Sequence, residues 1–219
     1  MSPRFVDLSH AVEHGVVTYK GLPAPLICDY LSRADSHAHY APGTEFQIGR
    51  IEMVGNTGTY VDSPFHRFAH GKDLAELPLE SLAELEALVV DLPQGSRALL
   101  PEHLERLELA GRALLVRTGW SRHYATERYF DGHPFVSRAA AELCVARGVR
   151  LVGIDSLNID DTADRSRPVH TLLLGAEIPI AEHLTNLTEL PRDGFRFSAV
   201  PARVRAFGTF PVRAYARLS

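Results

Sequence analysis

Polar side chains gather around a glycine and a proline in the segment from Asn56 to His66, which reads Asn-Thr-Gly-Thr-Tyr-Val-Asp-Ser-Pro-Phe-His. Gly58 and Pro64 would interrupt the pairing of a strand, and the proline would also break a helix. The segment is therefore expected to be an ordered loop that directs side chains into a cavity. Within it, Asp62 and His66 carry the groups that best bind a metal ion or transfer a proton.

A second set of such groups lies in the C-terminal part of the chain. His170 and Glu182 stand there beside apolar segments, and Asp155 and Asp160 precede them. An imidazole and two carboxylates, with Asp62 as the second, are suitable ligands for zinc or manganese. Such an ion lowers the pKa of a water molecule and polarises a carbonyl, as amide or ester hydrolysis requires. A free histidine beside it can move protons, because its pKa lies near neutrality.

The same residues also have an ordinary structural interpretation. An aspartate such as Asp62, which precedes a Ser-Pro pair, is typical of a turn or a cap. His66 would then be a surface histidine, and Glu182 would be a solvated carboxylate. Composition and spacing alone leave this interpretation and the metal site both open.

Short apolar segments predict the elements that must hold these residues in place. Strands are expected at residues 5–9, 46–54, 87–92, 113–118, 149–155, 195–200 and 204–207, and helices at 77–82, 101–109 and 137–147. The strand at 46–54 alternates as a half-buried strand does, Ser137 is placed to cap its helix, and residues 20–45 are expected to be irregular. This order predicts a single domain over residues 1–219, of α/β class, with a mixed sheet flanked by helices.

The composition excludes several classes of protein. The net charge is -4 and the pI is about 6.2, so no basic surface for nucleic acid is expected. The sequence has no apolar run long enough to cross a membrane and no secretory h-region after Met1. Cys28 and Cys144 match no zinc-ribbon spacing and are expected to be reduced, buried thiols, which favours a cytoplasmic location.

With these residues in view, the sequence resembles the cyclase family of metal-dependent hydrolases, which includes bacterial kynurenine formamidases and isatin hydrolases. The loop of that family reads His-x-Gly-Thr-His-x-Asp-x-Pro-x-His. Its glycine, threonine, aspartate, proline and last histidine are in register with Gly58, Thr59, Asp62, Pro64 and His66. Residues 5–10, 115–120, 152–156 and 169–187 resemble further blocks of the family in the same order. The resemblance implies the family's fold, with a partly barrel-like sheet.

The resemblance also implies a role for each matching residue. The family binds two metal ions, and the ligands of one are present as Asp62, His170 and Glu182, with His66 as the general acid and base. Asn56 and Tyr60 stand where the family has the two histidines that bind the other ion. An amide oxygen and a protonated phenol are poor metal ligands. We therefore expect one divalent ion, zinc or manganese, with Tyr60 as a phenolate ligand or a substrate contact, or else a site that has lost its metal.

Two functions follow from this interpretation. One is a metal-dependent hydrolase of a small aryl or cyclic amide, formamide or ester, with the conversion of N-formylkynurenine to kynurenine and formate as the leading family reaction. The other is a non-hydrolytic relative, either a small-molecule binder or a metal-free lyase or dehydratase that uses Tyr60 and His66 as an acid–base pair. Substrate contacts are expected from Asn56, Phe65 and Trp120. The resemblance further implies a homodimer or homotetramer, and a structural role without a pocket is the third alternative.

Overall fold

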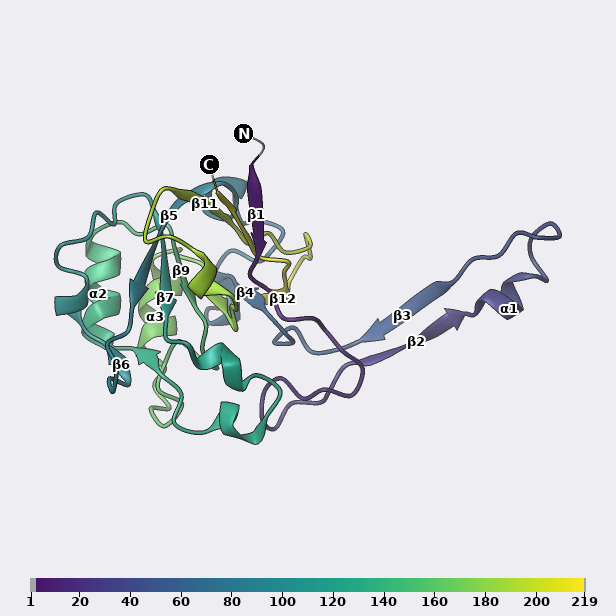
Figure 1. Ribbon diagram of the computed structural model, residues 1–219, viewed down its shortest axis with the longest axis horizontal. Helices are drawn as coiled ribbons and strands as arrows, with labels where there is room; N and C mark the ends of the chain where they lie inside the picture. The colour runs from purple at the N-terminus through teal and green to yellow at the C-terminus, as the bar shows by residue number, and fades with distance from the viewer. Residues whose placement is uncertain (1–2, 219) are drawn as a thin grey trace.

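A nine-stranded mixed sheet forms the centre of the molecule in the computed structural model, which describes residues 3–218 (Figure 1). Its strands lie in the order β1-β13-β11-β5-β7-β9-β10-β4-β12. Their bounds are β1 Arg4–Asp7, β4 Tyr60–Asp62, β5 Leu85–Asp91, β7 Ala113–Arg117, β9 Leu151–Ile154, β10 Ile180–Glu182, β11 Phe195–Ser198, β12 Thr209–Pro211 and β13 Tyr215–Leu218. The three helices are α1 Arg33–Ser36, α2 Arg138–Ala146 and α3 Pro168–Gly175. Two short pairs, β2 Leu26–Leu31 with β3 Ile48–Glu52 and β6 Ala98–Leu99 with β8 Phe135–Val136, complete the strands.

The sheet is parallel in its middle and antiparallel at both ends. Strands β5, β7, β9 and β10 run parallel to one another, whereas β4 pairs antiparallel with both β10 and β12. The sheet curls into a half-barrel, and α2 and α3 lie on one side of it (Figure 1). The predicted α/β class with a mixed, partly barrel-like sheet is confirmed. The predicted single domain over residues 1–219 includes residues 1, 2 and 219, which lie outside the described part of the chain.

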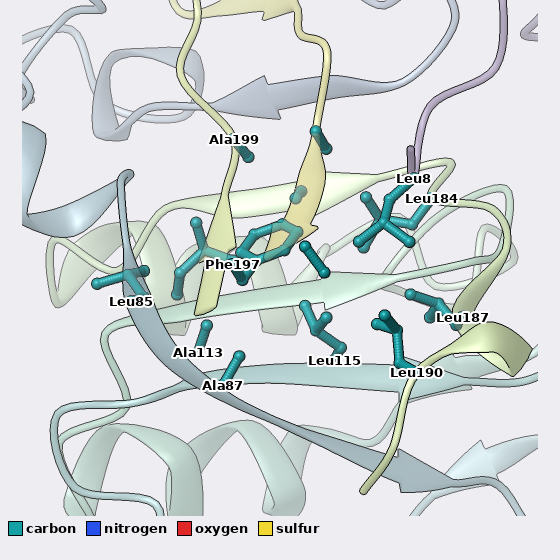
Figure 2. Packing of buried hydrophobic residues seen from close by; sticks show 14 of the residues in the cluster. Leu8, Leu85, Ala87, Ala113, Leu115, Leu184, Leu187, Leu190, Phe197 and Ala199 are labelled. Carbon is teal, nitrogen blue, oxygen red and sulfur yellow. The ribbon is translucent and has the colours of Figure 1, made fainter. Parts of the chain in front are cut away.

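Both faces of the central strands are buried, because successive side chains of a strand point to opposite faces. Leu115 of β7 belongs to the core on one face, together with Phe197 of β11 (Figure 2). Leu114, the preceding residue, packs on the other face in the core that includes α2 and α3. This explains the continuous apolar run at 113–116, which is typical of parallel strands covered on both sides.

The two longer helices begin at identifiable residues. Ser137 caps α2, as predicted, because its side chain accepts a hydrogen bond from the backbone N–H of Ala140. Helix α3 begins with Pro168, which suits the first helical position, and follows Arg167 in a left-handed conformation with φ 50° and ψ 58°. No helix among residues 3–218 has the length and apolar character needed to cross a membrane.

A long arm projects from the body and corrects two predictions. Residues 20–45, expected to be irregular, contain β2 and α1, and β2 pairs with β3 in a ribbon that extends away from the sheet (Figure 1). Strand β3 was expected to be half-buried, yet all five of its residues are exposed, including Ile51 at 56%. The alternation at 46–54 is real, but nothing else within residues 3–218 covers its apolar side.

Three other predicted elements differ from the structure. The helix expected at 101–109 is a single 3-10 turn, Pro101–His103. The guanidinium of Arg147 donates hydrogen bonds of 3.0 to 3.4 Å to the carbonyl oxygens of Leu104, Glu105 and Leu107, because these groups are not bonded within a helix. The helix expected at 77–82 is likewise one 3-10 turn, Leu79–Ser81. The strand expected at 204–207 is a loop, since Ala206 takes a positive φ and its N–H bonds to the carboxylate of Asp73 at 2.6 Å.

Candidate metal centre

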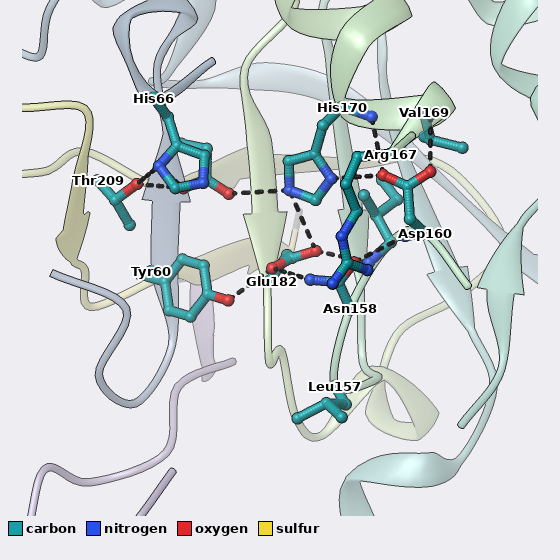
Figure 3. A network of polar contacts seen from close by, with 12 residues as sticks. Tyr60, His66, Leu157, Asn158, Asp160, Arg167, Val169, His170, Glu182 and Thr209 are labelled. Carbon is teal, nitrogen blue, oxygen red and sulfur yellow. Dashed lines mark hydrogen bonds and ion pairs between the residues drawn. The ribbon is translucent and has the colours of Figure 1, made fainter. Parts of the chain in front are cut away.

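The three predicted ligands reach one place from two neighbouring strands and a helix. Asp62 ends β4, Glu182 ends β10, and the register pairs Glu182 with Tyr60 and Ile180 with Asp62. Because the period of a strand is two residues, Tyr60, Asp62 and Glu182 share one face of the sheet. His170 in the first turn of α3 lies over this face (Figure 3). Asp62, His170 and Glu182 are all buried, with at most 6% of the residue exposed.

Asp160 fixes the orientation of the His170 ring. Its carboxylate accepts hydrogen bonds from His170 Nδ1 at 2.6 Å, from the N–H of His170 at 3.1 Å and from the N–H of Val169 at 2.7 Å (Figure 3). Since Nδ1 carries the proton of the bond to Asp160, Nε2 is the ring nitrogen that would offer its lone pair to a metal ion. A carboxylate that holds a histidine in this way is usual behind metal-binding histidines.

Two carboxylate oxygens lie near His170 Nε2, although Glu182 is not in the group of ligand atoms that all lie within 4.8 Å of one another. Asp62 Oδ2 lies 3.7 Å from Nε2 and Glu182 Oε1 lies 3.8 Å from it. These separations are too long for hydrogen bonds, but two ligands placed about 2.1 Å from a tetrahedral ion are roughly 3.4 Å apart. Asp62 Oδ2 is moreover buried and has no hydrogen-bond partner. A buried carboxylate oxygen without a partner is costly, and an ion at this point would satisfy it.

His66 joins the same centre from the 3-10 turn Pro64–His66 and is partly exposed. Thr209 donates its only proton to Asp62, so the 2.8 Å contact between Thr209 Oγ1 and His66 Nδ1 requires Nδ1 to be the donor. The lone pair of His66 is then on Nε2. Ligand atoms of Asp62, His66 and His170 all lie within 4.8 Å of one another. His66 is therefore placed either to complete a metal site or to move a proton beside one.

Tyr60 is committed to Glu182. Its hydroxyl donates a 2.6 Å hydrogen bond to Glu182 Oε2, and its ring is fully buried, 5.0 Å from the ring of His183 (Figure 3). Burial and the charge of Glu182 raise the pKa of Tyr60 well above its ordinary value, so the phenol stays neutral. The predicted phenolate ligand is therefore not supported by its surroundings, and Tyr60 instead holds a ligand in place.

The charges around His170 favour a cation at the centre. Burial of the ring acts against its protonation, but the hydrogen bond to Asp160 and the nearby charges of Asp62 and Glu182 outweigh this and raise the pKa of His170 to about 10. Burial also opposes the ionisation of Asp62, yet the two nearby imidazoles lower its pKa. The same carboxylates that favour a proton on His170 would favour a divalent ion in its place.

A cavity of about 250 Å³ opens beside these residues. Of the predicted site residues, it is lined by Asn56, Tyr60, His66, His170 and Glu182. Phe65 and Trp120, predicted to contact substrate, are not among its lining. Trp120 is buried in a separate cluster with Tyr129 and Leu157, and its indole N–H donates to the Tyr129 carbonyl at 3.0 Å.

The sequence interpretation missed several residues of the centre. Five further residues line the cavity, namely Tyr19, Leu22, Arg67, Asn158 and Arg167. Asp160 was noted only as a nearby carboxylate, and its position did not single it out, because Asp155 is the carboxylate that directly follows β9. Asp155, noted with it, instead accepts hydrogen bonds from the turn at Thr118 and Gly119. Thr209 had no signal, because it comes from a distant strand.

Comparisons with known proteins agree with this arrangement. The family model described as "Putative cyclase" matches residues 6–161, a span that includes the 56–66 loop. A kynurenine formamidase of Salinibacter ruber is 28% identical over 170 residues, which are 78% of this chain and 79% of that protein. The solved structure of a potential metal-dependent hydrolase with cyclase activity has a TM-score of 0.82 at 23% identity, and covers 100% of this chain and 99% of its own.

An isatin hydrolase A structure from Labrenzia aggregata, bound to benzyl benzoate, also has a TM-score of 0.82, at 22% identity. It covers 99% of this chain and 94% of its own. At this identity the two structures establish a shared fold. The family model matches residues 6–161, which is more than half of the chain, and this match carries the family assignment.

Proposed function

The chain belongs to the Cyclase family, and on this basis we propose that it is a metal-dependent hydrolase of a small amide. One divalent ion, zinc or manganese, is held by Asp62, His170 and Glu182. The observation that carries the proposal is the buried, unpartnered Asp62 Oδ2, which faces Nε2 of His170 at 3.7 Å. Two carboxylates and one neutral imidazole balance the charge of a divalent ion and leave positions open for water and substrate.

His66 is placed to transfer the proton that hydrolysis requires. When bound, the ion supplies Lewis acidity that activates water and polarises the substrate carbonyl. His66 presents its Nε2 lone pair because Nδ1 is held by Thr209. It takes a proton from water as the new C–O bond forms, and gives it to the nitrogen as the C–N bond breaks. The products are a carboxylic acid and an amine, so water is the only other reactant.

The substrate class follows from the relatives and from the small cavity. The relatives include kynurenine formamidases, and a 250 Å³ cavity suits a compact substrate. We propose an aryl formamide, with the conversion of N-formylkynurenine to kynurenine and formate as the first reaction to assay. Location in the cytoplasm is part of the same proposal.

Metal analysis and an assay on the same preparation test the proposal. Protein purified without chelator is expected to hold about one zinc or manganese per chain and to hydrolyse aryl formamides. Asp62→Asn should lose the metal, whereas His66→Gln should keep it and lose about 100- to 10,000-fold in kcat. If neither metal nor hydrolysis is found with a panel of formamides, amides and lactones, the proposal is wrong.

The non-hydrolytic alternative rests on Asn56 and Tyr60, which replace the family's two loop histidines. An acid–base pair of Tyr60 and His66 receives little support, because the Tyr60 hydroxyl is buried and bonded to Glu182. The double change Asn56→His with Tyr60→His separates the two functions. Hydrolysis that appears only in this variant, with a second bound ion, would favour the non-hydrolytic parent.

We also propose that the arm packs against a second copy of the chain, in a homodimer or homotetramer. A two-stranded ribbon is marginally stable alone, and this one exposes Leu26, Tyr30, Ile48 and Ile51. Sedimentation of the wild type should give an oligomer, and Tyr30→Lys with Ile51→Lys should give a monomer. Leu79→Lys, at an exposed leucine outside the arm, is the control. A monomeric wild type would refute the assembly.

A further inference from the structure

We infer that the cavity beside the metal centre binds a carboxylate of its substrate through Arg167 and Arg67. Both arginines line that cavity, and they are the cationic side chains of its lining apart from the histidines. The inference rests on the proposed function for the identity of the reaction, and it narrows the substrate to an amide or formamide that also carries a carboxylate.

Arg167 is held over the cavity by an unusual backbone conformation. Its φ of 50° and ψ of 58° lie in the left-handed region, which is unfavourable for a residue with a side chain. Such conformations persist where the surrounding structure requires them, and they are common at functional sites. The guanidinium Nη1 donates to Asn158 Oδ1 at 3.4 Å, and Asn158 in turn donates to Glu182 at 3.4 Å (Figure 3). One amide side chain thus connects Arg167 with a metal ligand.

Arg67 follows His66 directly and lies at the rim. Its Nε donates to Thr171 Oγ1 at 3.1 Å, and its guanidinium carbon lies 5.2 Å from the centre of the Phe68 ring. These contacts fix one edge of the guanidinium and leave its terminal N–H groups available. A guanidinium presents donors in a planar fork that matches the two oxygens of a carboxylate.

Neither arginine has a carboxylate partner among the described residues. Several others do, for example Arg117 with Asp91 and Arg97 with Asp161. In the proposed metal-bound state, Asp62 and Glu182 would balance one divalent ion and so would not neutralise the two arginines. Two positive charges therefore remain beside the cavity, and an anionic substrate would neutralise at least one of them.

A pair of substrates that differ only in charge tests the inference. N-formyl-3-aminobenzoate carries a carboxylate, and N-formyl-3-aminobenzamide replaces it with a neutral group of similar size. The wild type should prefer the carboxylate in kcat/KM. Arg167→Gln should reduce this preference by about 10- to 100-fold, the range expected for a lost hydrogen bond to a charged group. Arg67→Gln should reduce it less, because Arg67 lies at the rim.

The control is Arg165→Gln, which removes an exposed arginine two residues from Arg167 that is not part of the lining. Its preference should equal that of the wild type, and the metal content of every variant should stay constant. If both substrates are hydrolysed with no preference, or if the preference survives in Arg167→Gln, the carboxylate site is refuted while the hydrolase stands.

A binding measurement decides the inference even if neither compound is hydrolysed, an outcome that would count against the hydrolase. Titration calorimetry compares the Kd of 3-aminobenzoate with that of 3-aminobenzamide. The carboxylate site predicts tighter binding of the benzoate, and a benzoate advantage that falls by about 10-fold or more in Arg167→Gln. An advantage that is absent from the wild type, or equal in the wild type and the variant, overturns it.

Discussion

Replacement of Asp160 by asparagine would test whether the metal centre depends on a residue that does not itself reach the ion. The two oxygens of Asp160 accept three N–H groups, from Val169 N, His170 N and His170 Nδ1. Asparagine has nearly the same shape but only one oxygen, and its NH₂ group is a donor. At least one of the three buried N–H groups would therefore face another donor.

The size of the effect follows from this count. One buried donor without a partner costs about 1–3 kcal/mol of folding free energy. In a chain of this length that corresponds to a fall in Tm of about 2–12 °C. The lost bond also frees the His170 ring to turn or to change tautomer, and loss of such a supporting carboxylate typically lowers metal affinity by about 10- to 100-fold.

Two measurements separate the two parts of the effect. Thermal unfolding in excess chelator reports on the metal-free fold, and competition with a chelator of known affinity reports on metal binding. Asp161→Asn is the matched control, because the neighbouring carboxylate pairs with Arg97 at 3.1 Å near the surface. Loss of that pair should cost at most about 1 kcal/mol.

The reasoning fails if Asp160→Asn keeps both the metal-free Tm within 1 °C of the wild type, an order-of-magnitude margin, and a metal affinity within about 3-fold. A fall in Tm with unchanged affinity would show that Asp160 supports the fold but does not orient the ligand. The two readouts therefore distinguish a structural role of this carboxylate from a role in the centre.

Two further changes test neighbouring parts of the structure. Tyr60→Phe removes the hydroxyl bonded to Glu182 and should lower the free energy of unfolding by about 1–2 kcal/mol while one metal ion still binds; loss of the ion in this variant, measured by element analysis, would contradict the supporting role. Burial lowers the pKa of His10 to about 4, whereas its pKa in the unfolded chain is near 6.5. Between these pH values the His10 ring binds a proton in the unfolded state but not in the folded state. The free energy of unfolding should therefore fall as the pH drops below about 6.5. Urea unfolding at several pH values should show a shallower fall for His10→Gln, because glutamine does not titrate in this range. The change removes no hydrogen bond of Nε2, since that atom has none. An identical pH dependence of stability would refute this.

The sequence predicts the sheet well where burial is complete. The runs at 87–92 and 113–118 are strands, because both faces of each are covered and few alternatives exist for such apolar segments. Prediction failed where contacts between distant segments decide the outcome. In the segment 101–109, where a helix was expected, backbone carbonyls instead accept hydrogen bonds from Arg147, which lies at the end of another helix. The prediction for the β2–β3 arm failed for the opposite reason, because no core surrounds these two strands.

At the site, the residues of the motif were predictable from the sequence, but the residues that orient them were not. Asp62 and His66 stand in one short segment, which was predicted to be a loop but contains β4 and a 3-10 turn, and the resemblance supplied His170 and Glu182. Thr209, which orients His66, is 147 residues from Asp62 in the sequence. Nothing in local spacing indicates such a partner. Phe65 was expected at the cavity because it flanks the segment that carries Asp62 and His66, but it is not part of the lining.

The position of β4 has a consequence for how the protein folds. This strand is held between β10 and β12, and Tyr60 and Glu182 meet across 122 residues of chain. Contacts of such separation form late, because a long loop must be closed before they contribute. The ion's ligands therefore come together only when nearly the whole chain has been synthesised and the C-terminal strands have docked. A metal ion would therefore bind and stabilise the protein only after folding, and it could not nucleate folding.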